Sequence, residues 1–166
     1  MRLSGLMAEV RECEDLERLR GLEGQAALYY NMLFDQMILQ QKEHFFFHAR
    51  SRRPPMDNVN AMLSLAYTLL ANDTASALEG VGLDAYVGFL HRDRPGRVSL
   101  ALDLMEELRG IAADRFVLTL INKRLVDADG FLKKENGAVL MKDETRKTFL
   151  TAWHERKQEK LVHPYL

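Results

Sequence analysis

The sequence predicts a mostly α-helical fold: a single helical bundle domain with a small β-hairpin near residues 131–142. Its 166 residues contain only 10 glycines and 4 prolines, and long stretches repeat apolar residues every three or four positions, as amphipathic helices do. Asn136-Gly137 separates two short alternating runs, which is typical of a tight hairpin. A chain of this length is normally one domain with a buried core, so we expect one domain over residues 1–166.

Two helices are expected in the N-terminal part of the chain. Apolar residues set among charges over residues 3–19 predict an amphipathic surface helix. Gly21 and Gly24 flank the expected start of a second helix over residues 22–41. A basic loop that ends at Pro54-Pro55 then separates this helix from the rest of the chain.

Capping residues and one glycine place the remaining helices. Asp57, Ser99 and Asp143 each precede a periodic apolar stretch and are suitable N-caps, while Gly82 interrupts the periodicity. The helices expected from these signals cover residues 59–81, 100–114, 115–126 and 144–160.

The composition excludes several classes of function. Lys plus Arg (23) nearly balances Asp plus Glu (24), so any basic surface must be local. The single cysteine, Cys13, excludes an internal disulfide and a thiolate metal cluster and fits a reducing compartment. Because the sequence lacks both a signal-peptide pattern and a run of about 18 apolar residues, we expect a soluble cytoplasmic domain without a membrane partner.

An acidic pair, Asp103 and Glu106, lies in an apolar predicted helix soon after His91 and a basic loop. Residues three positions apart lie on the same side of a helix. Buried carboxylates need a cation or strong donors, so either a bound metal or an arginine explains the pair. His91 is likewise open to two interpretations, as a metal ligand or as a histidine satisfied by a backbone carbonyl.

Glu23 is a further candidate ligand because it lies between two glycines that allow a close approach, although a glutamate early in a helix also favours the helix dipole. A histidine with two or three carboxylates suits Mg²⁺ or Mn²⁺, and such sites commonly serve phosphodiester chemistry. His44 and His48 lie among aromatic and cationic residues, and Glu79 lies at an expected helix end, so these are weaker candidates.

Two basic tracts lie near these candidate ligands in the sequence. Arginine forks suit phosphate groups, so the tracts are candidates for contacts with a nucleic-acid backbone, although a solvated loop explains a charge run equally well. No histidine has a glutamate three positions before it, which excludes the motif of di-iron carboxylate bundles. The arginines concerned are Arg50, Arg52 and Arg53 in the first tract and Arg92, Arg94 and Arg97 in the second.

Four long motifs follow one another along the chain: RGLEGQAALYY, RRPPMDNVNAMLSLAYTLL, GLDAYVGFLHRDRPGRVSLALDLMEELR and TAWHERKQEKLVHPYL. Together they resemble the C-terminal helical catalytic domain of the CRISPR-associated integrase-endonuclease family that acquires new spacers, and its type I-C branch in particular. The resemblance implies that Glu23, His91 and Glu106 are catalytic ligands of Mg²⁺ or Mn²⁺. It further implies that Asp103 contributes to the metal site and that Asn60 contacts DNA or supports the site.

The implied activity is metal-dependent cleavage and transesterification of DNA phosphodiesters, which inserts new spacers at repeat boundaries. The implied partners are double-stranded DNA (spacer precursor and repeat), companion CRISPR adaptation subunits and, in the full-length family, a second copy of the chain. That family also has an N-terminal β-rich domain and a C-terminal tail, so we expect a fragment with weak or no activity by itself. The alternative function is a non-catalytic helical module that binds DNA or a partner.

Overall fold

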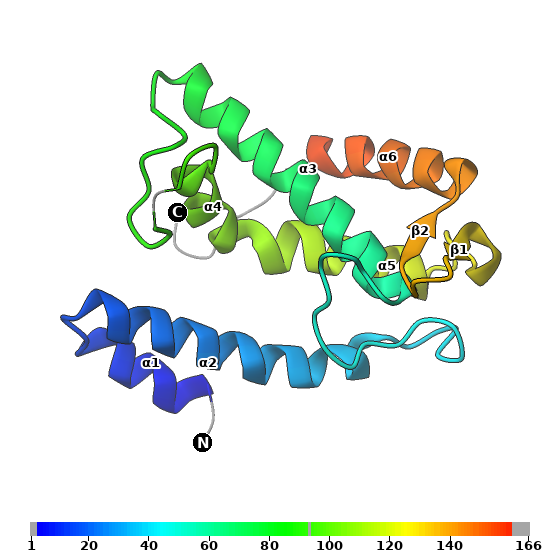
Figure 1. Cartoon of the computed structure of the whole chain (residues 1–166), viewed down its shortest axis with the longest axis horizontal. Coiled ribbons are helices and arrows are strands. Elements are labelled where there is room, and N and C mark those ends of the chain that lie inside the picture. Colours follow the sequence, from blue (N-terminus) through cyan, green and yellow to red (C-terminus); the bar gives the residue numbers. More distant parts are fainter. Residues whose placement is uncertain (1–2, 93, 161–166) are drawn as a thin grey trace. The chain divides into compact units, whose positions relative to one another are not determined.

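The computed structural model describes residues 3–92 and 94–160, which are mostly helical with one two-stranded sheet, as expected (Figure 1). No helix in these ranges is long and apolar enough to cross a membrane. The α-helices are α1 (Leu3–Arg11), α2 (Leu16–Phe34), α3 (Asn58–Gly80), α4 (Ser99–Leu108), α5 (Arg115–Asn122) and α6 (Asp143–Gln158). The other elements are η1 (Asp35–Met37), η2 (Arg109–Asp114), η3 (Ala128–Gly130), β1 (Phe131–Lys133) and β2 (Val139–Met141).

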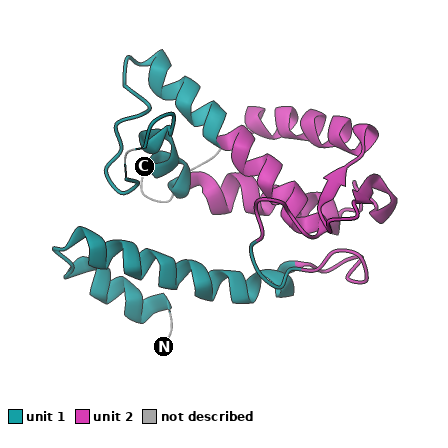
Figure 2. Cartoon of the chain, in the orientation of Figure 1, with its two compact units in different colours: residues 1–37, 47–50, 71–107 teal, residues 38–46, 51–70, 108–166 magenta. Residues whose placement is uncertain are grey.

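The chain divides into two compact units, a subdivision that the sequence did not indicate (Figure 2). Unit 1 comprises residues 1–37, 47–50 and 71–107, and unit 2 comprises residues 38–46, 51–70 and 108–166. The helix α3 belongs to both units, because its first part lies in unit 2 and its second part in unit 1.

The boundary between the first two helices differs from the one expected. α1 ends at Arg11, and α2 begins at Leu16 because Asp15 is its N-cap. The Asp15 carboxylate accepts the Arg18 amide at 2.9 Å, which satisfies one of the free amides of the first helical turn. The expected continuous helix over residues 3–19 is therefore wrong. α1 packs on α2 within unit 1, and Leu6 and Leu22 are buried.

The cap signals place α3 correctly and α4 to within one residue. Asp57 Oδ1 accepts the Asn60 amide at 2.7 Å, so Asp57 caps α3 as expected. α4 begins at Ser99, which is its first helical residue and not the expected cap. It continues into η2, a π-helical segment that the sequence did not predict. Asp114, at the end of η2, is buried and accepts the Tyr67 hydroxyl. The Arg109 guanidinium, at the start of η2, lies 4.4 Å from the centroid of the Tyr67 ring.

Aromatic contacts form part of the core of unit 2. Phe116 of α5 meets Phe149 and Trp153 of α6 edge-on, with ring centroids 5.0 and 5.1 Å apart. Edge-on pairs bury much apolar area and add about 0.5–1.5 kcal/mol each. α6 begins at Asp143, which is its first helical residue and not its cap, because the cap position belongs to Lys142.

The expected hairpin is confirmed. β1 and β2 pair antiparallel, with Phe131 opposite Met141. Gly137 in the turn has a φ of 81°, a left-handed conformation that glycine adopts without strain.

A small apolar cluster in unit 1 fixes the segment that precedes His91. Leu78, Ala85 and Ala101 are buried together. The amides of Leu100 and Ala101 also donate to the Ala85 carbonyl, at 3.0 and 3.3 Å. The loop before His91 is therefore anchored on the first turn of α4.

Candidate functional site

Asp103 holds His91 through both its backbone and its ring. Asp103 Oδ1 accepts the His91 amide at 2.9 Å and lies 2.7 Å from His91 Nδ1. Asp103 Oδ2 accepts the amides of Phe89 and Leu90 at 2.6 and 3.0 Å. One carboxylate of α4 thus organises the whole backbone turn that ends at His91.

These donors also determine the charge of Asp103. Partial burial by itself raises the pKa of the carboxyl, but hydrogen bonds from the Phe89 amide and the His91 ring, and from the His91 and Leu90 amides, outweigh it. The pKa of Asp103 therefore lies below its usual value, and the group is ionised at neutral pH.

The Asp103 contact selects one tautomer of a neutral His91. Because the carboxylate only accepts, Nδ1 carries the proton and Nε2 keeps its lone pair. Metal-binding histidines in proteins are commonly oriented by a carboxylate in this way. Nε2 is thus the ring nitrogen that can bind a cation or accept a proton.

Gly88 allows the loop to lie directly against α4. A Cβ atom at this position would lie 2.6 Å from the Ser99 Cβ, which is closer than real Cβ contacts, and 3.0 Å from Asp103 Oδ2. The glycine of the GFLH motif is therefore required by packing.

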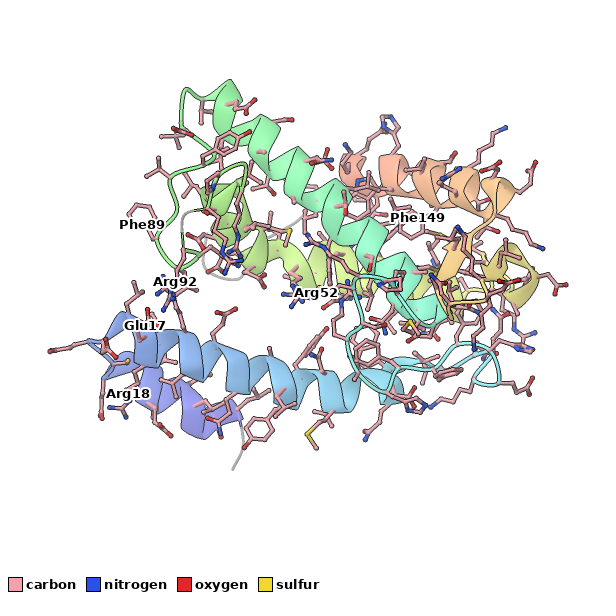
Figure 3. The ribbon with its side chains drawn as sticks, viewed as in Figure 1. Glu17, Arg18, Arg52, Phe89, Arg92 and Phe149 are labelled. Atoms are coloured by element: carbon pink, nitrogen blue, oxygen red, sulfur yellow. The ribbon has the colours of Figure 1, made fainter. Side chains whose placement is uncertain are left out.

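A second element, α2, holds the same loop. Arg20 Nε donates to the Leu90 carbonyl at 2.6 Å, and the Arg20 side chain is only 21% exposed. Its Nη1 pairs with Glu17 Oε1, while Arg92 Nη2 binds Glu17 Oε2 at 2.7 Å (Figure 3). The hydrogen bond from Arg92, followed by the contacts with Arg20, lowers the pKa of Glu17.

Neither Arg20 nor Glu17 was identified from the sequence. The available signal was their spacing, since Glu17, Arg20 and Glu23 follow one another at intervals of three and therefore share one side of α2.

A cavity of about 270 Å³ in unit 1 brings several predicted residues together. Glu23, which is exposed, and His91, which is largely buried, both contribute to its wall. Four arginines line the cavity, of which Arg20 and Arg92 are paired with Glu17. Guanidinium groups suit a phosphate ligand. Its lining consists of Arg20, Glu23, Leu90, His91, Arg92, Arg94 and Arg97.

The expected metal ligands gather only in part. Within residues 3–92 and 94–160, no three His, Cys, Asp or Glu side chains form a group that could hold a metal ion. Asp103 already accepts four hydrogen bonds, which is about the capacity of a carboxylate. Glu106 lies half-buried one turn further along α4. The structure thus makes Asp103 the group that orients His91, and the remaining ligand set stays a prediction.

Asn60 has a structural role in unit 2. It is fully buried, its Oδ1 accepts the Ser51 amide at 3.1 Å, and its Nδ2 donates to Asp57 at 2.7 Å. A contact between this side chain and DNA would require the start of α3 to rearrange.

The arginines of the first basic tract lie in different settings. Arg52 and Arg53 are exposed in unit 2, where solvent reaches their guanidinium groups (Figure 3 labels Arg52). Arg50 belongs to unit 1 and is half-buried. Contacts of all three with DNA stay predictions.

Comparison with known proteins decides the family. The family model described as CRISPR associated protein Cas1 matches residues 1–155. The chain belongs to the Cas1 family. The resemblance seen in the four motifs is thereby confirmed, while the type I-C branch stays a prediction.

Individual relatives agree with this family. The chain is 57% identical over 153 residues to the CRISPR-associated endonuclease Cas1 2 of Rhodospirillum rubrum, covering 92% of this chain and 44% of the relative. A casposase bound to integration product superposes with a TM-score of 0.87 at 28% identity, covering 98% of this chain and 45% of that one. A partial Cas6-RT-Cas1–Cas2 complex gives a TM-score of 0.84 at 27% identity, covering 98% and 50%. The chain thus spans about half the length of these proteins.

Proposed function

We propose that this chain is the helical catalytic part of a DNA endonuclease-integrase of CRISPR adaptation, which cleaves and transesterifies phosphodiesters to insert new spacers. The observation that carries the proposal is the cavity of unit 1, where Glu23 and His91 meet four arginines. The name of the Rhodospirillum rubrum relative, an endonuclease, supports the cleavage step.

The residues of the cavity divide the work of phosphodiester chemistry. Arg92, Arg94 and Arg97 bind backbone phosphates by forked hydrogen bonds. Asp103 keeps the His91 ring in one orientation and one tautomer, so that Nε2 is presented without reorganisation during the reaction. Since phosphate contacts carry no sequence information, this part of the protein holds DNA by its backbone.

A divalent cation fits the donor chemistry of this cavity. Imidazole nitrogen and carboxylate oxygen are ligands that Mg²⁺ and Mn²⁺ accept. Glu23 and His91 would hold the ion, together with Glu106, which the family resemblance implies. When bound, the ion would stabilise negative charge on the phosphate oxygens.

The partners that we propose are double-stranded DNA, companion adaptation subunits and, for a full-length protein, a second copy of the chain. The casposase bound to integration product and the Cas1–Cas2 complex are similar to this chain over nearly its whole length. Their names support a DNA substrate and a companion subunit respectively.

Cleavage of labelled duplex DNA in Mn²⁺ tests this function. We expect Glu23→Gln and His91→Asn to lower the cleavage rate at least about 100-fold, because each removes a proposed ligand. Glu79→Gln is the matched control, since this exposed glutamate at the end of α3 lies outside the cavity lining. Cleavage that is unchanged by both ligand variants, with DNA still bound, would favour the non-catalytic DNA-binding module.

A further inference from the structure

We propose that Arg20 and Arg92 form a phosphate-binding subsite, which the Glu17 carboxylate occupies in the DNA-free chain and leaves when DNA binds. The inference rests on the proposed function, because it assumes that the cavity receives a DNA backbone.

The contacts of Glu17 show the subsite with an anion already bound. One oxygen of Glu17 pairs with Arg20 Nη1, and the other accepts Arg92 Nη2 at 2.7 Å. Two oxygens of one anion, each bound by a separate guanidinium group, are also what a phosphodiester offers. The carboxylate therefore marks a position that a phosphate group can occupy.

The two arginines differ in how firmly they are held. Arg20 is 21% exposed and is also tied to the Leu90 carbonyl, so it keeps its place when Glu17 leaves. The Arg92 side chain is 66% exposed and the Glu17 side chain 60% exposed. Ion pairs between exposed groups are weak and are screened by salt, so a DNA phosphate, whose binding also releases counterions, can replace Glu17 on Arg92.

The position of the subsite connects it to the proposed reaction centre. Both arginines line the cavity that contains Glu23 and His91. Arg20 precedes Glu23 by three residues on α2, an axial rise of about 4.5 Å. The subsite would thus bind a phosphate close to the one that reacts.

A simpler role for Glu17 predicts a different outcome. Glu17 lies in the first turn of α2, where a negative charge favours the helix dipole. If that were its whole role, Glu17→Gln would slightly lower the stability of the chain. Its DNA affinity would then be no higher than that of a control variant that loses one negative charge elsewhere.

The test compares DNA affinity in metal-free buffer at low salt, by fluorescence anisotropy with a labelled duplex. Glu17→Gln is expected to bind about two- to fivefold tighter than the wild type, because the competing ion pair is gone. Glu9→Gln is the matched control: it removes the same charge from α1, where Glu9 lies 4.0 Å from Arg18, and is expected to change the affinity less than half as much. The gain should vanish when Glu17→Gln is made in an Arg92→Met background.

Three results would overturn the subsite: no gain with Glu17→Gln, an equal gain with Glu9→Gln, or a gain that persists without Arg92. The outcome is separate from that of the proposed function. A wild type that cleaves DNA while Glu17→Gln shows no gain refutes only the subsite. Tighter binding by Glu17→Gln in a chain that never cleaves DNA refutes only the nuclease.

Discussion

One oxygen of Asp103 binds His91 twice, accepting its backbone amide at 2.9 Å and lying 2.7 Å from its ring Nδ1. The position of the loop and the orientation of the imidazole therefore depend on the same atom. A change at Asp103 should disturb catalysis through His91, even though Asp103 does not line the cavity of unit 1.

Asp103→Asn is expected to lower the cleavage rate about 10- to 100-fold. The asparagine amide has one acceptor oxygen where the carboxylate has two, so it cannot accept from all the loop amides and the His91 ring, and it selects the ring tautomer less well. The DNA dissociation constant should stay within a factor of two, since the arginines of the cavity are unchanged. Steady-state kinetics together with binding measurements separate the two effects. Asp129→Asn, at an exposed position in η3, is the control. A loss of DNA affinity as large as the loss of cleavage rate would contradict an orienting role.

Gly88→Ala should destabilise the chain because the added methyl group would lie 2.6 Å from the Ser99 Cβ and 2.8 Å from the Ser99 carbonyl carbon. Overpacking of this kind typically lowers the free energy of unfolding by about 1–3 kcal/mol. Urea denaturation measures the effect. Gly5→Ala in α1 is the matched control, since a Cβ there meets nothing within 4 Å, and alanine is the better helix former. Equal stability of the two variants would show that the loop does not lie on α4 as described.

Asn60→Ala tests whether Asn60 is structural or binds DNA. The substitution leaves the Ser51 amide without its Asn60 acceptor, and a buried group that loses its partner costs about 1–3 kcal/mol. We expect lower stability in urea and unchanged DNA affinity below the unfolding transition. A loss of affinity at full stability would instead support the DNA contact implied by the family resemblance.

Tyr67 should make the stability of unit 2 depend on alkaline pH. Burial raises the pKa of its hydroxyl well above the usual value, and the neighbouring Asp114 raises it further. Since the folded pKa exceeds the unfolded value of about 10, the contribution of Tyr67 is complete below pH 10 and declines as the pH rises above it. Urea unfolding from pH 8 to 11 should show this decline, and Tyr67→Phe should show less of it. Identical pH profiles would contradict the buried, neutral hydroxyl.

Local signals in the sequence predicted those elements that depend on local chemistry. Asp57 caps α3 and Asn136-Gly137 forms the hairpin turn, because each acts on atoms a few residues away. The break before α2 was missed since Asp15 lies in an acidic stretch that also continues the amphipathic pattern. The π-helical η2 was missed because its apolar and small residues do not differ from those of an ordinary helix.

The candidate site was predicted only in part, since Arg20 and Glu17 were missed. The motifs identified Glu23, His91 and the arginines after it, which the structure brings to one cavity. That Asp103 orients His91 depends on where three loop amides meet α4. This contact joins segments about a dozen residues apart through an irregular loop. The helical repeat of apolar residues in the sequence therefore does not predict it.

The central claim is that Glu23 and His91 Nε2 bind a divalent cation in the arginine-lined cavity. Anomalous diffraction from a crystal soaked in Mn²⁺ tests it most directly. We predict a peak about 2.0–2.4 Å from Glu23 and from His91 Nε2, with Asp103 still bound to Nδ1. A peak bonded to Asp103 in place of His91, or a soaked crystal with no peak in the cavity, would contradict the claim.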